Sequence, residues 1–173
     1  MTIKLHFEVR RVEAHERPLV ASFLEAHWGS VQIVSRGQVH EADGLPAFIA
    51  IWDEQLVGLV TYHIHEGVCE IVSLDSLMVK IGVGTALVEA VVQEATHFGC
   101  HRLWLITSND NLSALGFYQR RGFRLVAVYQ GAIDKAREVK PNISLIGMDN
   151  IPIHDEIELE LGLRAKNLSL AQT

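Results

Sequence analysis

Two glycines separated by a single residue, Gly82 and Gly84, stand between a β-forming run and a run with helical spacing. The first backbone N–H groups of a helix have no partner within it, and the helix dipole places partial positive charge at the same end. An anion such as a phosphate group is therefore stabilised there. The Rossmann fingerprint would need a further glycine where Leu87 stands, and the Gly-Lys-Ser/Thr of phosphate loops is absent. The turn predicts an anion site, with a tight turn that binds nothing as the alternative.

A second pattern follows one strand and one helix later along the chain. The segment from Asn111 to Phe123 reads N-x-x-A-x-x-F-Y-x-x-x-G-F. With the glycine turn upstream, it resembles the GNAT superfamily of acyl-CoA-dependent N-acetyltransferases over about residues 47–129. The resemblance implies acetyl-CoA as cosubstrate. It also implies an α/β (α+β) fold, with a mixed, mostly antiparallel central sheet that has parallel central strands and is flanked by helices.

The resemblance assigns a set of residues to the cosubstrate. The pyrophosphate loop of the family is usually Gln/Arg-x-x-Gly-x-Gly/Ala; here both glycines match and Val79 takes the first polar position. Lys80 could supply part of the missing charge. Arg120 and Arg121 could reach the adenosine phosphates or merely complement the helix dipole. The residues implied in CoA binding are Leu77, Lys80, Gly82, Val83, Gly84, Thr85, Asn111, Ala114, Tyr118 and Arg121.

Acetyl transfer to an amine needs an acid for the departing thiolate and a base for the amine, which is protonated at neutral pH. The resemblance places Tyr118 near the sulfur as the acid, with a packed helix tyrosine as the alternative. Glu70 is the candidate base, because apolar neighbours on both sides would desolvate its carboxylate and raise its pKa. A solvent-facing strand glutamate is the alternative. Asp75 is the second choice, and strand alternation predicts that it faces the side of the sheet opposite to Glu70.

The acceptor site is expected from loops on either side of this region. Trp28 and Arg36 lie where the family places its acceptor-binding segments, although an ordinary helix end with Trp28 packed inward is the alternative. Asp155 and Glu156 lead into the last predicted strand and could bring carboxylates to the acceptor, which would favour a cationic one. The residues assigned to the acceptor are Trp28, Arg36, Tyr62 and Asp155.

These residues need strands and helices to position them, and hydrophobic periodicity predicts both. The segment between Arg36 and Gly44 is predicted as a loop, and Asp53 to Gln55 as a hairpin turn. The middle of the chain should form a parallel or mixed sheet with right-handed crossovers. The predicted strands are Ile3–Val12, Val31–Val34, Ala47–Trp52, Leu56–His65, Val68–Leu77, His101–Thr107, Phe123–Tyr129 and Glu156–Leu161, and the predicted helices are Ala14–Trp28, Val83–Phe98, Asn111–Arg121 and Ala132–Val139.

Composition bounds the remaining possibilities. The 173 residues are 49% hydrophobic, with a net charge of −6, so we expect one soluble domain over residues 1–161, a frayed tail over 162–173, and neither nucleic-acid nor membrane binding. The first residues read as a strand and not as a signal peptide, which favours the cytoplasm. Cys69 and Cys100 are expected as reduced thiols in the core or at strand ends. His63 and His65 share a strand face, but without an identifiable third ligand a solvated face is favoured over a metal site.

The sequence therefore predicts an N-acetyltransferase that requires no metal and moves an acetyl group from acetyl-CoA to an unidentified primary amine by direct attack in a ternary complex. Two other classes stay open. One is a non-catalytic acyl-CoA-binding module of the same fold, and the other is a nucleotide-binding protein that uses the same glycine turn. A homodimer is possible in each case.

Overall fold

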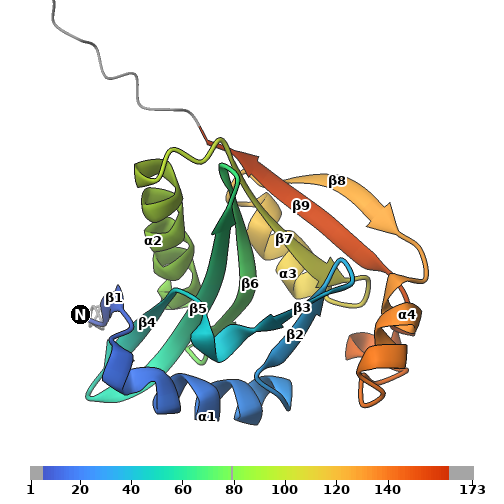
Figure 1. Cartoon of the computed structure of the whole chain (residues 1–173), viewed down its shortest axis with the longest axis horizontal. Coiled ribbons are helices and arrows are strands. Elements are labelled where there is room, and N and C mark those ends of the chain that lie inside the picture. Colours follow the sequence, from blue (N-terminus) through green and yellow to red (C-terminus); the bar gives the residue numbers. More distant parts are fainter. Residues whose placement is uncertain (1–5, 79, 164–173) are drawn as a thin grey trace, which may run out of the picture.

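The computed structural model describes residues 6–78 and 80–163, and these form a seven-stranded sheet, a separate two-stranded sheet and four α-helices (Figure 1). Val79 and the expected C-terminal tail beyond Leu163 lie outside the described residues. The elements are β1 (Glu8–Arg11), α1 (Arg17–Trp28), β2 (Gln32–Ser35), β3 (Gln38–Glu41), β4 (Ala47–Trp52), β5 (Gln55–His65), β6 (Val68–Ser76), α2 (Val83–His97), β7 (Arg102–Ser108), α3 (Leu112–Gln119), β8 (Arg124–Tyr129), α4 (Ala132–Val139) and β9 (Glu156–Gly162).

The large sheet has the strand order β1-β4-β5-β6-β7-β9-β8. Every neighbouring pair is antiparallel except β6 and β7, which run parallel. Parallel neighbours need a crossover connection, and α2 provides it. The predicted fold class, a mostly antiparallel sheet with a parallel central pair and flanking helices, is confirmed. Among the described residues, no helix is long and apolar enough to cross a membrane.

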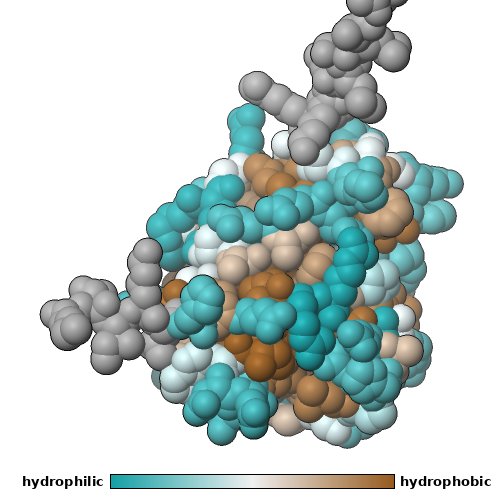
Figure 2. All heavy atoms as spheres, turned by 90° about the vertical axis from the view of Figure 1, so that its left-hand side faces the viewer, coloured by the Kyte–Doolittle hydropathy of each residue, from teal (hydrophilic) through white to brown (hydrophobic). Residues whose placement is uncertain are grey.

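Helices cover the two faces of the sheet, and each face has its own buried cluster. On one face α1 packs Val20, Phe23 and Leu24 onto the sheet. On the other, α2 and α3 cover the larger cluster, which includes the free thiols Cys69 and Cys100 as the sequence predicts. Hydrophilic side chains surround a smaller apolar area on the side of the molecule where β1 lies (Figure 2).

The turn between β4 and β5 is one residue shorter than the sequence predicts. Gln55 already pairs with Trp52, so only Asp53 and Glu54 connect the strands. Both have positive φ, 49° and 60°, as a two-residue type I′ hairpin turn requires. Left-handed backbone is strained for residues with a Cβ, which is why a turn without glycine is hard to recognise in a sequence.

The predicted loop between Arg36 and Gly44 is wrong, because this segment contains β3, which pairs with β2 as a small hairpin. The residue that β3 buries is His40, with a relative exposure of 4%. A polar residue at a buried position breaks the alternation of apolar and polar residues that identifies a strand.

The ends of two other strands also differ from the prediction. β1 is shorter than predicted, since it begins at Glu8, and the predicted residues 3–5 lie outside the described range. β9 extends through Gly162, which the sequence assigns to the tail.

Candidate active site

The sheet opens in its middle, between the two parallel strands. β6 and β7 pair only from Val68 with Arg102 to Ile71 with Leu105. Both strands continue beyond this point, β6 to Ser76 and β7 to Ser108, without pairing to each other. Backbone groups on the facing edges of the two strand ends are therefore free to bind an extended ligand.

The glycine turn lies at the open end of β6. Gly82 is the N-cap of α2 and has a φ of 95°, a left-handed conformation that suits glycine. Gly84 is buried in the first helical turn, where an added Cβ would lie 3.3 Å from the ring of Phe117. Glycine at this position lets α3 pack closely against the start of α2. Exposed Lys80 also has positive φ, 64°, and lies next to the turn.

Two predicted cosubstrate residues stabilise this part of the structure. Asn111 is the N-cap of α3, and its side-chain oxygen accepts a hydrogen bond from the Ala114 backbone N–H at 3.0 Å. Arg121 stacks on the ring of Phe117, with 3.5 Å between its guanidinium carbon and the ring centroid, and its Nε donates to Thr85 Oγ1 at 3.1 Å. Arg121 thus ties the end of α3 to the first turn of α2.

Tyr118 is buried on α3, with a relative exposure of 6%. Its ring packs edge-on against Phe117 and Phe123, with ring centroids 5.0 and 5.2 Å apart. Within the described part of the chain its hydroxyl has no hydrogen-bond partner. Burial raises the pKa of Tyr118, and the negative charge of Asp75 raises it further, whereas the charge of Arg121 lowers it. The phenol is therefore protonated at neutral pH, which is the form that a general acid needs.

Glu70, the predicted base, is buried on the sheet face that α1 covers. Its Oε1 accepts a hydrogen bond from Ser35 Oγ at 2.5 Å, and its Oε2 lies 3.4 Å from His40 Nε2. Both partners come from the small hairpin β2–β3, which the sequence only partly predicts. His63 is its cross-strand neighbour on β5. Glu70 therefore lies among polar groups, in contrast to the apolar surroundings that the flanking sequence predicts.

The prediction that Asp75 faces away from Glu70 is wrong, because β6 contains a β-bulge. Thr61 pairs with Ser73 and Tyr62 with Ile71, so Val72 is an extra residue that reverses the alternation beyond it. The Thr61 and Ser73 hydroxyls lie 2.7 Å apart on the same face as Glu70.

Asp75 consequently lies on the face that α1 covers. Trp28, the last residue of α1, donates a hydrogen bond from its Nε1 to Asp75 Oδ2 at 2.6 Å. Burial raises the pKa of Asp75, although this hydrogen bond opposes the shift. This hydrogen bond joins the end of α1 to the end of β6.

A cleft of about 810 Å³ adjoins the sheet opening on this face. Trp28, Ser35 and Asn111 line it, with apolar side chains from β2, β6, β7 and α4. Glu156, the first residue of β9, also lines it and has a relative exposure of 3%. The Oε2 atom of Glu156 has no hydrogen-bond partner within the described residues.

Glu156 is the functional candidate to which the sequence gives least weight. Burial raises its pKa, as does the charge of Glu70, whereas the backbone N–H and the charge of Arg36 lower it. Its cross-strand neighbours are Ser108 on β7 and Tyr129 on β8, which place its side chain beside the opening. The residues next to Glu156 in the sequence give no sign that its side chain is buried. Its burial follows from the pairing of β9 with both β7 and β8, which the sequence does not reveal.

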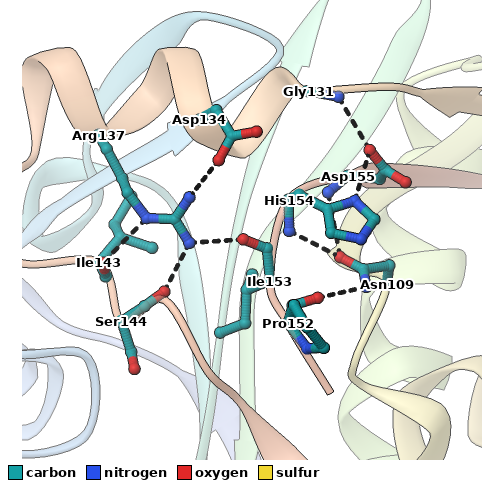
Figure 3. A network of polar contacts seen from close by, with 10 residues as sticks. All are labelled: Asn109, Gly131, Asp134, Arg137, Ile143, Ser144, Pro152, Ile153, His154 and Asp155. Carbon is teal, nitrogen blue, oxygen red and sulfur yellow. Dashed lines mark hydrogen bonds and ion pairs between the residues drawn. The ribbon is translucent and has the colours of Figure 1, made fainter.

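The segment between β8 and β9 forms the outer wall of the cleft, and one arginine organises it (Figure 3). Arg137 on α4 donates to the Asp134 carboxylate at 2.5 Å and to the carbonyl oxygens of Ile143, Ser144 and Ile153 at 3.1, 2.6 and 2.5 Å. A guanidinium group can hold several carbonyl groups at once because its donors have a fixed planar geometry.

Asp155, which the sequence assigns to the acceptor, belongs to the same wall. Its Oδ1 accepts from the backbone N–H of Gly131 at 2.8 Å and lies 2.8 Å from His154 Nδ1 (Figure 3). The hydrogen bond from His154, followed by that from Gly131, lowers its pKa. Asn109 braces the segment by accepting from the backbone N–H groups of His154 and Asp155. Asp155 is not among the residues that line the cleft.

Two other predicted acceptor residues lie away from the main cleft. Arg36 stacks on the ring of Tyr129, 3.2 Å from its centroid, and lines a second, smaller cavity of about 530 Å³ that also borders Glu156. Tyr62 lies in the core on the α2 face, where it stacks on Phe48 and donates a hydrogen bond to Glu94 at 3.3 Å. The structure thus brings Trp28 and Glu156 to the cleft and buries Tyr62 on the other side of the sheet.

Comparison with known proteins agrees with this geometry. A model of the acetyltransferase (GNAT) family matches residues 8–123. The chain belongs to the GNAT acetyltransferase family. This GNAT chain is 42% identical over 144 residues to the uncharacterized protein YxbD of Bacillus subtilis, covering 83% of this chain and 91% of YxbD.

Solved acetyltransferase structures share the fold at low sequence identity. The IAA acetyltransferase from Bacillus cereus superposes with a TM-score of 0.68 at 19% identity, covering 91% of this chain and 100% of that one. A Bacillus subtilis acetyltransferase in complex with CoA superposes with a TM-score of 0.63 at 20% identity, covering 92% and 99%. At such identities the likeness is one of fold, and the chemistry must be argued from the residues of this chain.

Proposed function

We propose that this GNAT domain transfers an acetyl group from acetyl-CoA to a primary amine by direct attack in a ternary complex. The strongest support is a single arrangement of groups. The opening between β6 and β7 lies beside the glycine turn of α2 and a cleft that contains Glu156, whose Oε2 has no hydrogen-bond partner among the described residues. Tyr118 is buried on α3, which packs against the start of α2. A CoA complex of a structural neighbour supports the choice of cosubstrate.

In this proposal the pyrophosphate binds at the first turn of α2. The backbone N–H groups that follow Gly82 have no partner within the helix and point toward an anion. Exposed Lys80 adds positive charge. The pantetheine arm follows the open edge of β6 past Leu77, with Asn111 and Ala114 on the side of α3.

The chemistry then needs only groups that this chain provides. The amine nitrogen attacks the thioester carbonyl carbon, and free backbone N–H groups of β6 stabilise the developing oxyanion. The carbon–sulfur bond breaks, and Tyr118 donates its proton to the departing thiolate. Holding both substrates in place supplies a large part of the acceleration, so loss of one side chain slows the reaction without abolishing it.

A buried carboxylate takes the proton from the amine. We assign this role to Glu156, because it lines the cleft, because its Oε2 has no hydrogen-bond partner in the part of the chain that the structure describes, and because burial raises its pKa. Glu70, the base predicted from the sequence, is the alternative. It reaches the cleft through the hydroxyl of Ser35, which lines the cleft and donates to Glu70.

The binding step is tested by thermal unfolding with acetyl-CoA, CoA, ATP and NAD in parallel. A ligand at about 100 times its Kd adds about 2.7 kcal/mol to the stability of the folded state. For a domain of this size that corresponds to a rise of roughly 5–11 °C. We expect the rise with both CoA species only. A rise with ATP or NAD alone would favour the nucleotide-binding alternative.

The catalytic step is tested by thiol release from acetyl-CoA with a panel of primary amines. We expect turnover with at least one amine and a strongly reduced rate in Tyr118→Phe. Binding of CoA without turnover across a broad panel of small amines, polyamines and peptides would instead favour the non-catalytic module.

A further inference from the structure

Three potential metal ligands from three strands converge beside the cleft. They are His40 on β3, His63 on β5 and Glu70 on β6, and one ligand atom from each lies within 4.8 Å of the others. His63 and Glu70 are direct cross-strand neighbours, so the pairing of β5 and β6 positions them. His40 comes from the small hairpin, which packs on the face of the large sheet that α1 covers.

One buried nitrogen of this cluster has no hydrogen-bond partner among the described residues. His40 is 4% exposed, and its Nε2 has no hydrogen-bond partner within the described part of the chain. Glu70 is 5% exposed and accepts one side-chain hydrogen bond, from Ser35. A buried polar atom without a partner loses the free energy of its hydration, which is why such atoms are rare and need an explanation.

We propose that His40, His63 and Glu70 bind a divalent cation, with Zn²⁺ as the best chemical match. Two imidazole nitrogens and one carboxylate oxygen form a ligand set typical of zinc sites that keep a fourth position open. The Ser35 hydroxyl orients the carboxylate from outside the ligand set, as the partners of metal ligands commonly do. His63 is partly exposed and provides a route of entry.

The neighbouring histidine is excluded from the site. The sequence pairs His63 with His65, which share a strand face. In the structure the His65 ring lies 6.0 Å from the ring of His63, and its side chain is 68% exposed beside Glu66. His65 therefore offers a matched control, since it has the same chemistry on the same strand and lies outside the cluster.

An ion at this site would join the β2–β3 hairpin to the large sheet, and this hairpin supplies Ser35 to the cleft. Glu70 would then act as a ligand, which leaves Glu156 as the carboxylate available to the amine. Metal binding by these three side chains does not depend on acetyl transfer.

The test uses the full chain after treatment with a chelator and its removal. Co²⁺ is titrated and followed by its visible d–d absorption, and Zn²⁺ binding is measured by calorimetry. We expect one ion per chain in the wild type and in His65→Gln. His40→Gln and His63→Gln should weaken binding by at least about 10–100-fold, which is the loss seen when only an outer partner of a ligand is removed, since each variant removes one of three protein ligands.

Two results would overturn the proposal. One is the absence of ion binding by the folded wild-type chain, and the other is binding by His63→Gln with wild-type affinity. Because His63 is partly exposed, its variant keeps the test valid if His40→Gln fails to fold, and circular dichroism identifies that case. Acetyl-CoA binding is measured on the same samples, so failure of the metal site and failure of the proposed function are distinguishable.

Discussion

Substitution of Gly58 by alanine tests how closely α2 must pack on the sheet. Gly58 lies in β5, opposite Ser76, under the first turns of α2. An added Cβ would lie 2.7 Å from Val83 Cγ1, 2.9 Å from Leu87 Cδ1 and 3.1 Å from the Asp75 carbonyl oxygen, whereas ordinary contacts begin at 3.4 Å. Val83 and Leu87 are completely buried, so neither side chain has free space to enter.

Relief of these contacts requires α2 or β5 to move by several tenths of an ångström. Overpacking of this kind costs about 1–3 kcal/mol. A domain of this size loses roughly 2–4 °C in Tm per kcal/mol, so we expect a decrease of about 2–12 °C. Val83 is the first residue of α2 and lies between the two glycines of the proposed pyrophosphate site, so the affinity for acetyl-CoA should fall as well.

Thermal unfolding with and without acetyl-CoA measures both effects. The matched control is Gly44→Ala, because a Cβ at Gly44 meets no atom within 4 Å and the backbone there is not left-handed. If Gly58→Ala unfolds at the same temperature as Gly44→Ala and binds acetyl-CoA equally well, the close packing of α2 on β5 is refuted.

Three further predictions concern acid–base chemistry. Tyr118→Phe should lower kcat by about 10²–10⁴-fold with unchanged acetyl-CoA binding, measured by thiol release and thermal shift, because it removes only the acid. Glu156→Gln should lower kcat by a similar factor and more than Glu70→Gln does; the reverse order would return the role of base to Glu70. The hydrogen bond from Arg10 lowers the pKa of Glu16 from 4.5 to about 2. The stability that this ion pair adds should therefore be complete above pH 4.5 and lost as the pH falls toward 2, and urea unfolding of Glu16→Gln across this range should lack that portion of the pH dependence.

The features that could be predicted from the sequence depend on neighbours along the chain. The glycine turn before α2, the helical spacing after it and the N-cap at Asn111 are all set within a few residues. Most strands and helices are predicted within two residues of their observed ends, because hydrophobic periodicity and turn chemistry act locally. The family motif is also contiguous, so membership of the GNAT family follows from the order of the residues alone.

The features that could not be predicted depend on residues far apart in the chain. The bulge at Val72 moves Asp75 to the face of Glu70, and it arises from the register between two strands. His40 is buried because β3 folds over the large sheet, and no local pattern of residues records that contact.

The burial of Glu156 has the same origin, since it follows from pairing with both β7 and β8. Side-chain alternation along one strand predicts which residues share a face, but not which strand lies opposite or where the register shifts. The sequence therefore specifies the elements and the chemistry of the cosubstrate turn through local interactions. Which carboxylates and histidines meet at the cleft depends on the tertiary structure, because strand pairing sets those distances.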